Sequence, residues 1–199
     1  MRCCYSERLI DKLLKLNEKA SNKVNITAIK RAIHFAKKYH GSQMRQSGDP
    51  YYSHPIEVAY MVADYLFSTD MIIVSLLHDT IEDTSLTKDM IAEVFDEQIA
   101  SHVMDLTRIK EDGYKISSAE MVKSLFNQKK YEVLIIKLFD RLHNMQTIGA
   151  KSPEKVKKIV DETIQSFITL SMYLGSRMPK MLQIEEEIYN LCYQNLIKM

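Results

Sequence analysis

The sequence predicts an all-α protein, folded as one helical bundle. Only 5 glycines and 4 prolines interrupt its 199 residues, and segments that alternate strictly between polar and apolar residues are missing. Apolar residues recur instead at the three- to four-residue spacing of amphipathic helices. A chain of this length suits one substantial domain and is short for two. Because we find neither an internal repeat nor a linker, we expect a single domain over residues 1–199.

Helices are expected first in the N-terminal part of the chain. Residues 29–37 begin an amphipathic helix that Gly41 is placed to stop. Pro55 suits the first turn of the following helix, because proline has no backbone N–H to offer there. Thr69 can cap a third, strongly apolar helix whose sequence, residues 71–82, is MIIVSLLHDTIE. The pattern therefore predicts at least three helices before residue 83.

Further helices are predicted in the middle of the chain. One should follow Thr87, and the sequence Ser117-Ser-Ala-Glu120 fits a capping box, which opens a helix. A long apolar helix should then contain residues 132–145. The stretch 110–118, which includes Gly113, is predicted to be a mobile loop.

The C-terminal part is also expected to be helical. Ser152-Pro153-Glu154 has the residues that start a helix, and Gly175 is placed to end it. Pro179 should begin a final, acidic amphipathic helix within a C-terminal extension, residues 176–199.

Composition excludes several classes of protein. The 27 Lys and Arg residues balance the 26 Asp and Glu residues, so no bulk positive charge favours nucleic acid or an anionic membrane as a partner. The longest apolar run, residues 71–77, is far shorter than the roughly 20 residues of a membrane span. Three cysteines, two of them adjacent, are not a disulfide framework. We therefore expect a reduced, soluble, cytoplasmic protein.

Polar residues that follow an apolar run give the strongest indication of chemistry. His78, Asp79, Glu82 and Asp83 come directly after the apolar segment that ends at Leu77. On a continuous helix, His78 would share a face with Glu82, and Asp79 with Asp83. His78 and Asp79 could then bind a metal ion, which would leave Glu82 and Asp83 for acid–base chemistry.

Two other segments contain similarly placed polar residues. Asp140 lies inside an apolar helix, where a carboxylate needs a partner or a metal ion. Asn144, four residues later, shares its face, and His54 lies where a helix should begin. Each has a structural alternative: His54 as a helix cap, and Asp140 in an ion pair with Lys137 or Arg141. The coincidence of all three segments favours a shared metal site.

These motifs together resemble those of a known family. Residues 45–55 read RQSGDPYYSHP, residues 76–84 read LLHDTIEDT, and residues 136–147 read IKLFDRLHNMQT. Their order and residues are similar to the hydrolase domain of the alarmone (ppGpp) synthetase/hydrolase proteins. The resemblance extends from about residue 29 to residue 175, and three ordered motifs are far more specific than one His-Asp pair.

The resemblance implies a helical HD-type fold, one bound Mn²⁺ ion, and hydrolysis of ppGpp at its 3′ position to GDP and pyrophosphate. It implies that the metal ligands are His54, His78, Asp79 and Asp140. It implies that Glu82 and Asp83 activate and orient the attacking water. The guanine nucleotide, a small-molecule substrate, would be held by Arg45, Ser47, Tyr51, Asn144 and Thr147.

The chain also departs from the pattern of this family at a few positions. Gln46 replaces a frequent lysine, and Gln146 replaces a common arginine. Phe139 stands where a small residue is usual, and Asp96 where glycine is typical. None of these changes removes an implied ligand or catalytic carboxylate, so we expect them to affect affinity and base selectivity more than chemistry.

The residues alone leave other functions open. Imidazole and carboxylate ligands suit Mn, Fe or Zn, and a divalent ion of this kind can polarise a phosphoryl oxygen and lower the pKa of water. The same scaffold could hydrolyse a different nucleotide, or bind a nucleotide without catalysis. The presence of both Glu82 and Asp83 argues against a pure sensor. A helical bundle without any ligand would leave the three motifs unexplained.

Overall fold

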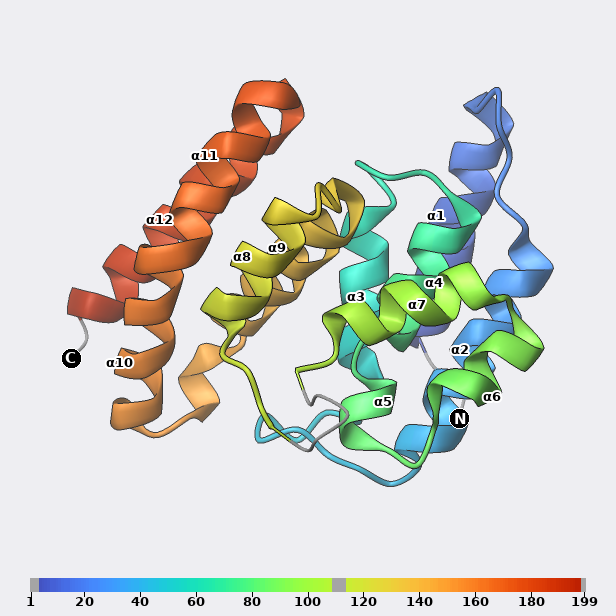
Figure 1. The fold of residues 1–199 in the computed structure, drawn as a ribbon, viewed down its shortest axis with the longest axis horizontal. Helices are drawn as coiled ribbons and strands as arrows, with labels where there is room; N and C mark the ends of the chain where they lie inside the picture. The colour runs from blue at the N-terminus through green and yellow to red at the C-terminus, as the bar shows by residue number, and fades with distance from the viewer. Residues whose placement is uncertain (1–3, 109–113, 198–199) are drawn as a thin grey trace. The chain divides into compact units, whose positions relative to one another are not determined.

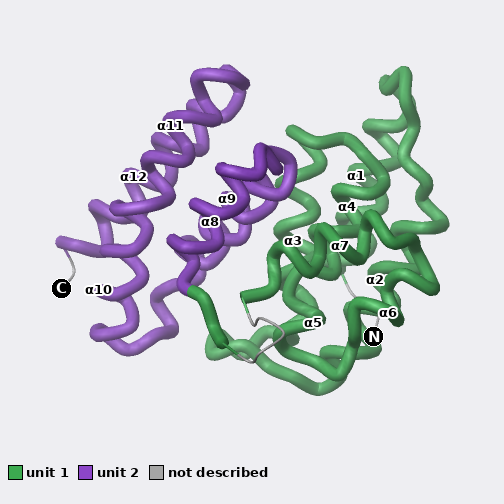
Figure 2. The backbone as a smooth tube through the Cα atoms, in the orientation of Figure 1, with its two compact units in different colours: residues 1–116 green, residues 117–199 purple. Residues whose placement is uncertain are grey.

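A computed structural model describes residues 4–108 and 114–197 of the protein (Figure 1). These residues are helical apart from turns, loops and bridge residues, among them a β-bridge that joins Met44 to Pro50. The all-α prediction is therefore confirmed. The chain forms two compact units, residues 1–116 and residues 117–199 (Figure 2).

The first unit contains the N-terminal helices. They are α1 (Cys4–Lys19), α2 (Ile26–His40), α3 (Ser53–Val62), α4 (Thr69–Leu77), α5 (Thr80–Asp83), α6 (Lys88–Val94) and α7 (Glu97–Leu106). Helix α4 is the centre of this unit, because it packs against α2, α3 and α7 and all its residues from Met71 to Leu77 are buried. Burial on every side explains why the segment is apolar throughout.

The ends of α2 and α3 follow the sequence signals. Gly41 ends α2 with a positive φ of 51°, a conformation that glycine adopts without steric cost. Pro55 lies in the first turn of α3. The predicted cap at Thr69 is wrong: Ser68 precedes α4 as its N-cap, and Thr69 Oγ1 accepts a hydrogen bond from the backbone N–H of Asn25.

The predicted continuous helix 71–82 is interrupted at the most polar point of its sequence. Helix α4 ends at Leu77, and the single turn α5 begins at Thr80. His78 and Asp79 form the junction, where the Thr80 hydroxyl donates to the Leu77 carbonyl oxygen over 2.6 Å. Both junction residues keep helical backbone angles, and the Asp83 N–H donates to the Asp79 carbonyl over 3.0 Å, so the helical spacing of Asp79 and Asp83 is kept across the junction.

The second unit contains the remaining helices. They are α8 (Ser118–Asn127), α9 (Tyr131–Gln146), η1 (Ile148–Ala150), α10 (Pro153–Glu162), η2 (Thr163–Phe167), α11 (Ile168–Arg177), η3 (Pro179–Met181) and α12 (Leu182–Ile197). Ser117 and Glu120 form the predicted capping box at the start of α8. Pro153 occupies the first turn of α10, and Pro179 begins the C-terminal helical segment, both as predicted.

Gly175 has a different role from the predicted one. It lies inside α11, which continues to Arg177, and a side chain there would approach Leu182 Cδ2 to 2.9 Å. The glycine therefore permits close approach of the next helical segment instead of ending a helix. The π-helical turn η2 separates α10 from α11, and periodicity did not predict it.

The predicted loop at 110–118 lies partly outside the described residues. Its described part begins at Tyr114 and ends in the capping box of α8. Among the helices that the structure describes, none combines the length and the apolar character that a membrane span requires.

Candidate metal and catalytic site

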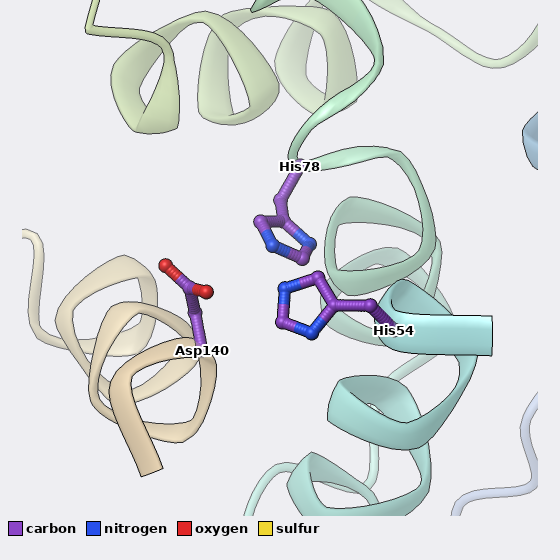
Figure 3. Close-up of side chains that lie close together, drawn as sticks. All are labelled: His54, His78 and Asp140. Atoms are coloured by element: carbon purple, nitrogen blue, oxygen red, sulfur yellow. The ribbon is translucent and has the colours of Figure 1, made fainter. Parts of the chain in front are cut away.

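Two buried histidines of the first unit lie side by side. His54 is in the first turn of α3, His78 follows the last residue of α4, and their exposed fractions are 3% and 2%. The ring centroids are 5.2 Å apart at an interplanar angle of 66° (Figure 3). Histidine is seldom buried this completely without a specific polar role. The pair therefore marks a functional or structural centre.

Asp79 connects the two imidazoles. Its Oδ2 is 3.4 Å from His54 Nε2, and its Oδ1 is 3.2 Å from His78 Nε2. His78 Nδ1 is 2.7 Å from the Ser75 carbonyl oxygen. A carbonyl can only accept, so Nδ1 must donate its hydrogen, and a neutral ring then turns the Nε2 lone pair toward the carboxylate.

Two lone pairs that face one another favour a cation between them. Imidazole nitrogen and carboxylate oxygen are ligands that Zn, Fe and Mn accept. A carbonyl that holds the far nitrogen of a ligating histidine is a common outer contact in metal sites. The donor set of His54, His78 and Asp79 therefore fits a divalent ion.

Glu82 is held by two cations. Arg108 Nη2 lies 2.8 Å and Lys115 Nζ 2.7 Å from Glu82 Oε1, and the backbone N–H of Arg108 donates to Oε2 over 3.1 Å. Burial alone would raise the pKa of Glu82, but the hydrogen bonds from Lys115 and Arg108 outweigh it and lower the pKa to about 2. Glu82 is therefore a permanently ionised carboxylate at neutral pH.

Asp83 has the opposite surroundings. Partial desolvation of this exposed side chain raises its pKa, the nearby charges of Asp79 and Glu82 raise it further, and the hydrogen bond from Tyr51 and the nearby His40 oppose them. The Tyr51 hydroxyl donates to Asp83 Oδ2 over 2.6 Å. Adjacent carboxylates thus have pKa values that are shifted in opposite directions, an arrangement that is typical of divided acid–base roles.

A third histidine supports this contact. His40, 1% exposed, stacks on the Tyr51 ring with a centroid distance of 4.7 Å, and its Nδ1 is 2.9 Å from Gln43 Oε1. Gln43 Nε2 in turn donates to the backbone carbonyl of Asp83 over 2.8 Å. The end of α2 and the following loop therefore hold both the side chain and the backbone of Asp83.

Asp140 belongs to α9 in the second unit and is 7% exposed. Lys137 Nζ is 2.7 Å from its Oδ2, and Asn144 Nδ2 donates to its Oδ1 over 2.6 Å. The expected neighbour relation between Asp140 and Asn144 is present. The structural alternative is present as well, because Lys137 forms the ion pair while Arg141 pairs with Glu162.

The predicted nucleotide contacts are distributed over both units. Arg45 and Ser47 lie in a tight loop, in which the Arg45 N–H donates to the Asp49 carbonyl over 2.8 Å and Ser47 Oγ donates to Asp49 Oδ2 over 2.9 Å. Tyr51, at the end of this loop, contacts Asp83. In the second unit, Thr147 Oγ1 donates to the His143 carbonyl over 2.9 Å. Their role in binding a nucleotide stays a prediction.

Three of the unusual residues have structural explanations. Asp96 has extended backbone, and its side chain caps α7 by accepting from the Ile99 N–H over 2.7 Å, so no left-handed conformation is needed there. Gln146 donates to Glu187 Oε1 over 2.7 Å, within the second unit. Phe139 is part of the core and is 1% exposed.

Sequence reasoning missed Arg108, Lys115, His40 and Gln43. Arg108 and Lys115 are 26 and 33 residues from Glu82, so local periodicity carries no information about these pairs. His40 lies on the buried face of α2, and its spacing from Ile29, Ile33 and Ala36 could have shown this.

Comparison with known proteins identifies the family. Residues 32–176 match the family model of the HD domain, which is most of the chain. The protein therefore belongs to the HD-domain family, and this family assignment confirms the HD-type fold inferred from the three motifs.

Two curated proteins are similar in sequence to this chain. It is 37% identical over 176 residues to the GTP pyrophosphokinase rsh of Brucella ovis, covering 86% of this chain and 23% of that protein. It is 40% identical over 149 residues to the guanosine-3′,5′-bis(diphosphate) 3′-pyrophosphohydrolase of Aquifex aeolicus, covering 74% of this chain and 21% of that protein. The chain thus spans less than a quarter of the length of these relatives.

A solved structure shares the fold. It is described as a metazoan ortholog of SpoT that hydrolyzes ppGpp and plays a role in starvation responses. The two superpose with a TM-score of 0.62 over 88% of this chain and 98% of that one, at 17% sequence identity. This similarity supports the all-α HD fold.

Proposed function

We propose that the protein is a metal-dependent phosphohydrolase that cleaves ppGpp at its 3′ position, yielding GDP and pyrophosphate. The observation that carries the proposal is the cluster of His54, His78 and Asp79, followed directly by two carboxylates with opposite pKa shifts. The choice of ppGpp as the substrate rests on the relatives that are named as ppGpp hydrolases. A match of residues 32–176 to one family model favours a single HD domain.

The proposed metal site has four protein ligands. His54, His78 and Asp79 would bind through the atoms that already face one another, and Asp140 of α9 would add a second carboxylate. We propose Mn²⁺ as the ion. When bound, the ion supplies Lewis acidity, which stabilises charge on a phosphoryl oxygen and makes water more acidic. We expect the enzyme to act in the cytoplasm, as its cysteine pattern predicts.

The nucleotide would be held by the segment before α3 and by the end of α9. Arg45 can stack on a base or form paired hydrogen bonds with a phosphate. Ser47, Asn144 and Thr147 offer polar hydrogen-bonding groups to the guanosine. Tyr51 would contribute to this pocket while its hydroxyl holds Asp83.

The substrate prediction is tested by following product release. With Mn²⁺, purified protein should convert ppGpp to GDP and intact pyrophosphate, and should cleave the adenine analogue more slowly, because a pocket with hydrogen-bonding groups for guanine leaves them unpaired against adenine. Arg45→Ala should raise KM more than it lowers kcat. If the protein does not hydrolyse ppGpp but rapidly hydrolyses a deoxynucleoside or nicotinamide phosphate, the substrate prediction is wrong and the HD assignment stands.

A second prediction concerns the pH dependence of turnover. Tyr51→Phe removes the hydrogen bond that lowers the pKa of Asp83, so that pKa should rise further. A base must be unprotonated to act, and turnover is therefore lost as the pH falls through its pKa. The acidic limb of the kcat profile should move to higher pH in Tyr51→Phe than in wild type. Tyr39→Phe, which removes a tyrosine hydroxyl near the end of α2, is the control. If the acidic limb does not move in Tyr51→Phe, the role assigned to Asp83 is contradicted.

A further inference from the structure

The side chains of Arg108 and Lys115 come together on Glu82. The backbone N–H of Ile116 donates to the Arg108 carbonyl over 3.0 Å, which places Ile116 beside Arg108. Both cationic side chains then converge on one oxygen of Glu82, at 2.8 Å and 2.7 Å. No sequence motif or family resemblance assigned either residue a role.

This ion-paired cluster is more specific than an ordinary surface ion pair. Side-chain exposure of Glu82 is 11%, and the carboxylate accepts from the Arg108 backbone as well as from both side chains. Exposed pairs contribute little because water screens them, whereas a shielded carboxylate with several charge-assisted hydrogen bonds is held in one orientation. The cluster therefore fixes where Glu82 points and keeps it charged.

We propose that Arg108 and Lys115 are positioning residues that hold Glu82 as a fixed anion, so that Asp83 is the carboxylate that accepts the proton of the attacking water. The inference rests on the proposed function. Glu82 orients the water by accepting a hydrogen bond from it. Glu82 does not take the proton, because its lone pairs are already shared with two cations. Asp83 accepts a hydrogen bond from the Tyr51 hydroxyl over 2.6 Å, and among the described residues no cation forms an ion pair with it.

The proposed reaction transfers one proton to Asp83 and replaces the P–O3′ bond with a bond from phosphorus to the water oxygen. One O–H bond of water breaks, and the proton passes to Asp83. The water oxygen forms a bond to the phosphorus attached to O3′ while the P–O3′ bond breaks and leaves its electron pair on O3′. A proton from bulk water completes the 3′ hydroxyl, Asp83 releases its proton to bulk water, and the products are GDP and pyrophosphate.

The first experiment requires no turnover. In protein loaded with Mg²⁺, carbon-13 NMR of the side-chain carboxyls, assigned with Glu82→Gln, gives the titration of Glu82. Glu82 should stay ionised below pH 4 in wild type, and in Arg108→Gln/Lys115→Gln it should titrate above its ordinary value of 4.5, because burial then acts unopposed. A Glu82 that titrates at or above its ordinary value of 4.5 in wild type overturns the proposal.

The second experiment is a double-mutant cycle in ppGpp hydrolysis. Arg108→Gln should lower kcat by about 10-fold or more with little change in KM, and should have no further effect in a Glu82→Gln background, since it acts through Glu82. Arg108→Lys should recover part of the loss. Lys88→Gln, which breaks an exposed ion pair with Glu97 in the same unit, is the control. An increase in KM that persists in the Glu82→Gln background would show that Arg108 binds substrate instead.

The two experiments separate the inference from the proposed function. If wild-type protein does not hydrolyse ppGpp, the proposed function fails, and the carboxyl titrations still decide whether Arg108 and Lys115 fix the charge of Glu82. If ppGpp is hydrolysed and the titrations of Glu82 are the same with and without the two cations, the function stands and the positioning role is wrong.

Discussion

Protein in which Glu82 and Asp83 are replaced by Gln and Asn should keep its divalent ion and lose turnover by about 10²-fold or more. Both residues lie beyond the junction that holds His78 and Asp79, and Glu82 interacts with Arg108 and Lys115. Neutral amides keep the shape of the side chains while removing the groups that would orient water and accept its proton.

Metal content, measured on the dialysed protein, and single-turnover kinetics with ppGpp separate the two effects. Exposed carboxylates of the same unit, changed together as Asp89→Asn/Glu93→Gln, serve as a control and should leave both quantities unchanged. Full turnover by the Glu82→Gln/Asp83→Asn protein would exclude both carboxylates from the reaction, whatever its metal content.

Replacing His78 with Asn should lower the affinity for the divalent ion by ~10²-fold or more, since even partners outside the ligand set cost 10- to 100-fold. The same change removes the Nδ1 contact with the Ser75 carbonyl that orients the ring. Asp140→Asn should weaken binding in the same direction, because it removes a negative charge from the proposed ligands. Titration with Mn²⁺, followed by electron paramagnetic resonance, measures both affinities.

His34→Ala provides the matched control, because His34 is an exposed histidine of α2. Its Mn²⁺ affinity should equal that of wild type. A structure of the Mn²⁺-loaded protein in which the ion lies away from Asp140 would contradict the four-ligand site, even if His78→Asn behaves as expected.

Signals that act over a few residues predicted the fold well. The capping box at Ser117, the prolines at 55 and 153, and the glycine at 41 each mark the helix ends that the structure has. Gly175 misled because glycine permits close helix packing as readily as it ends a helix. The break after Leu77 was missed because an apolar run that continues into polar residues still has helical periodicity.

The sequence predicted which residues form the candidate site, but not which residues surround Glu82 and Asp83. His54, His78 and Asp79 come together as the motifs indicated. The opposite environments of Glu82 and Asp83 depend on Arg108, Lys115 and Tyr51, which are 26 to 33 residues away in sequence. Tertiary contacts of that separation leave no periodic trace in a single sequence.

The separation of α4 from α5 has a consequence for how proteins with this site can diversify. A single helical turn is too short to be stable by itself. The position of α5 therefore depends on the contacts that Gln43 and Tyr51 make from one side and Arg108 and Lys115 from another. Substitutions at these four positions would retune the proposed proton transfer and leave the proposed ligands on α3 and at the end of α4 unchanged. Reactivity and metal retention can thus be inherited and selected as separate traits.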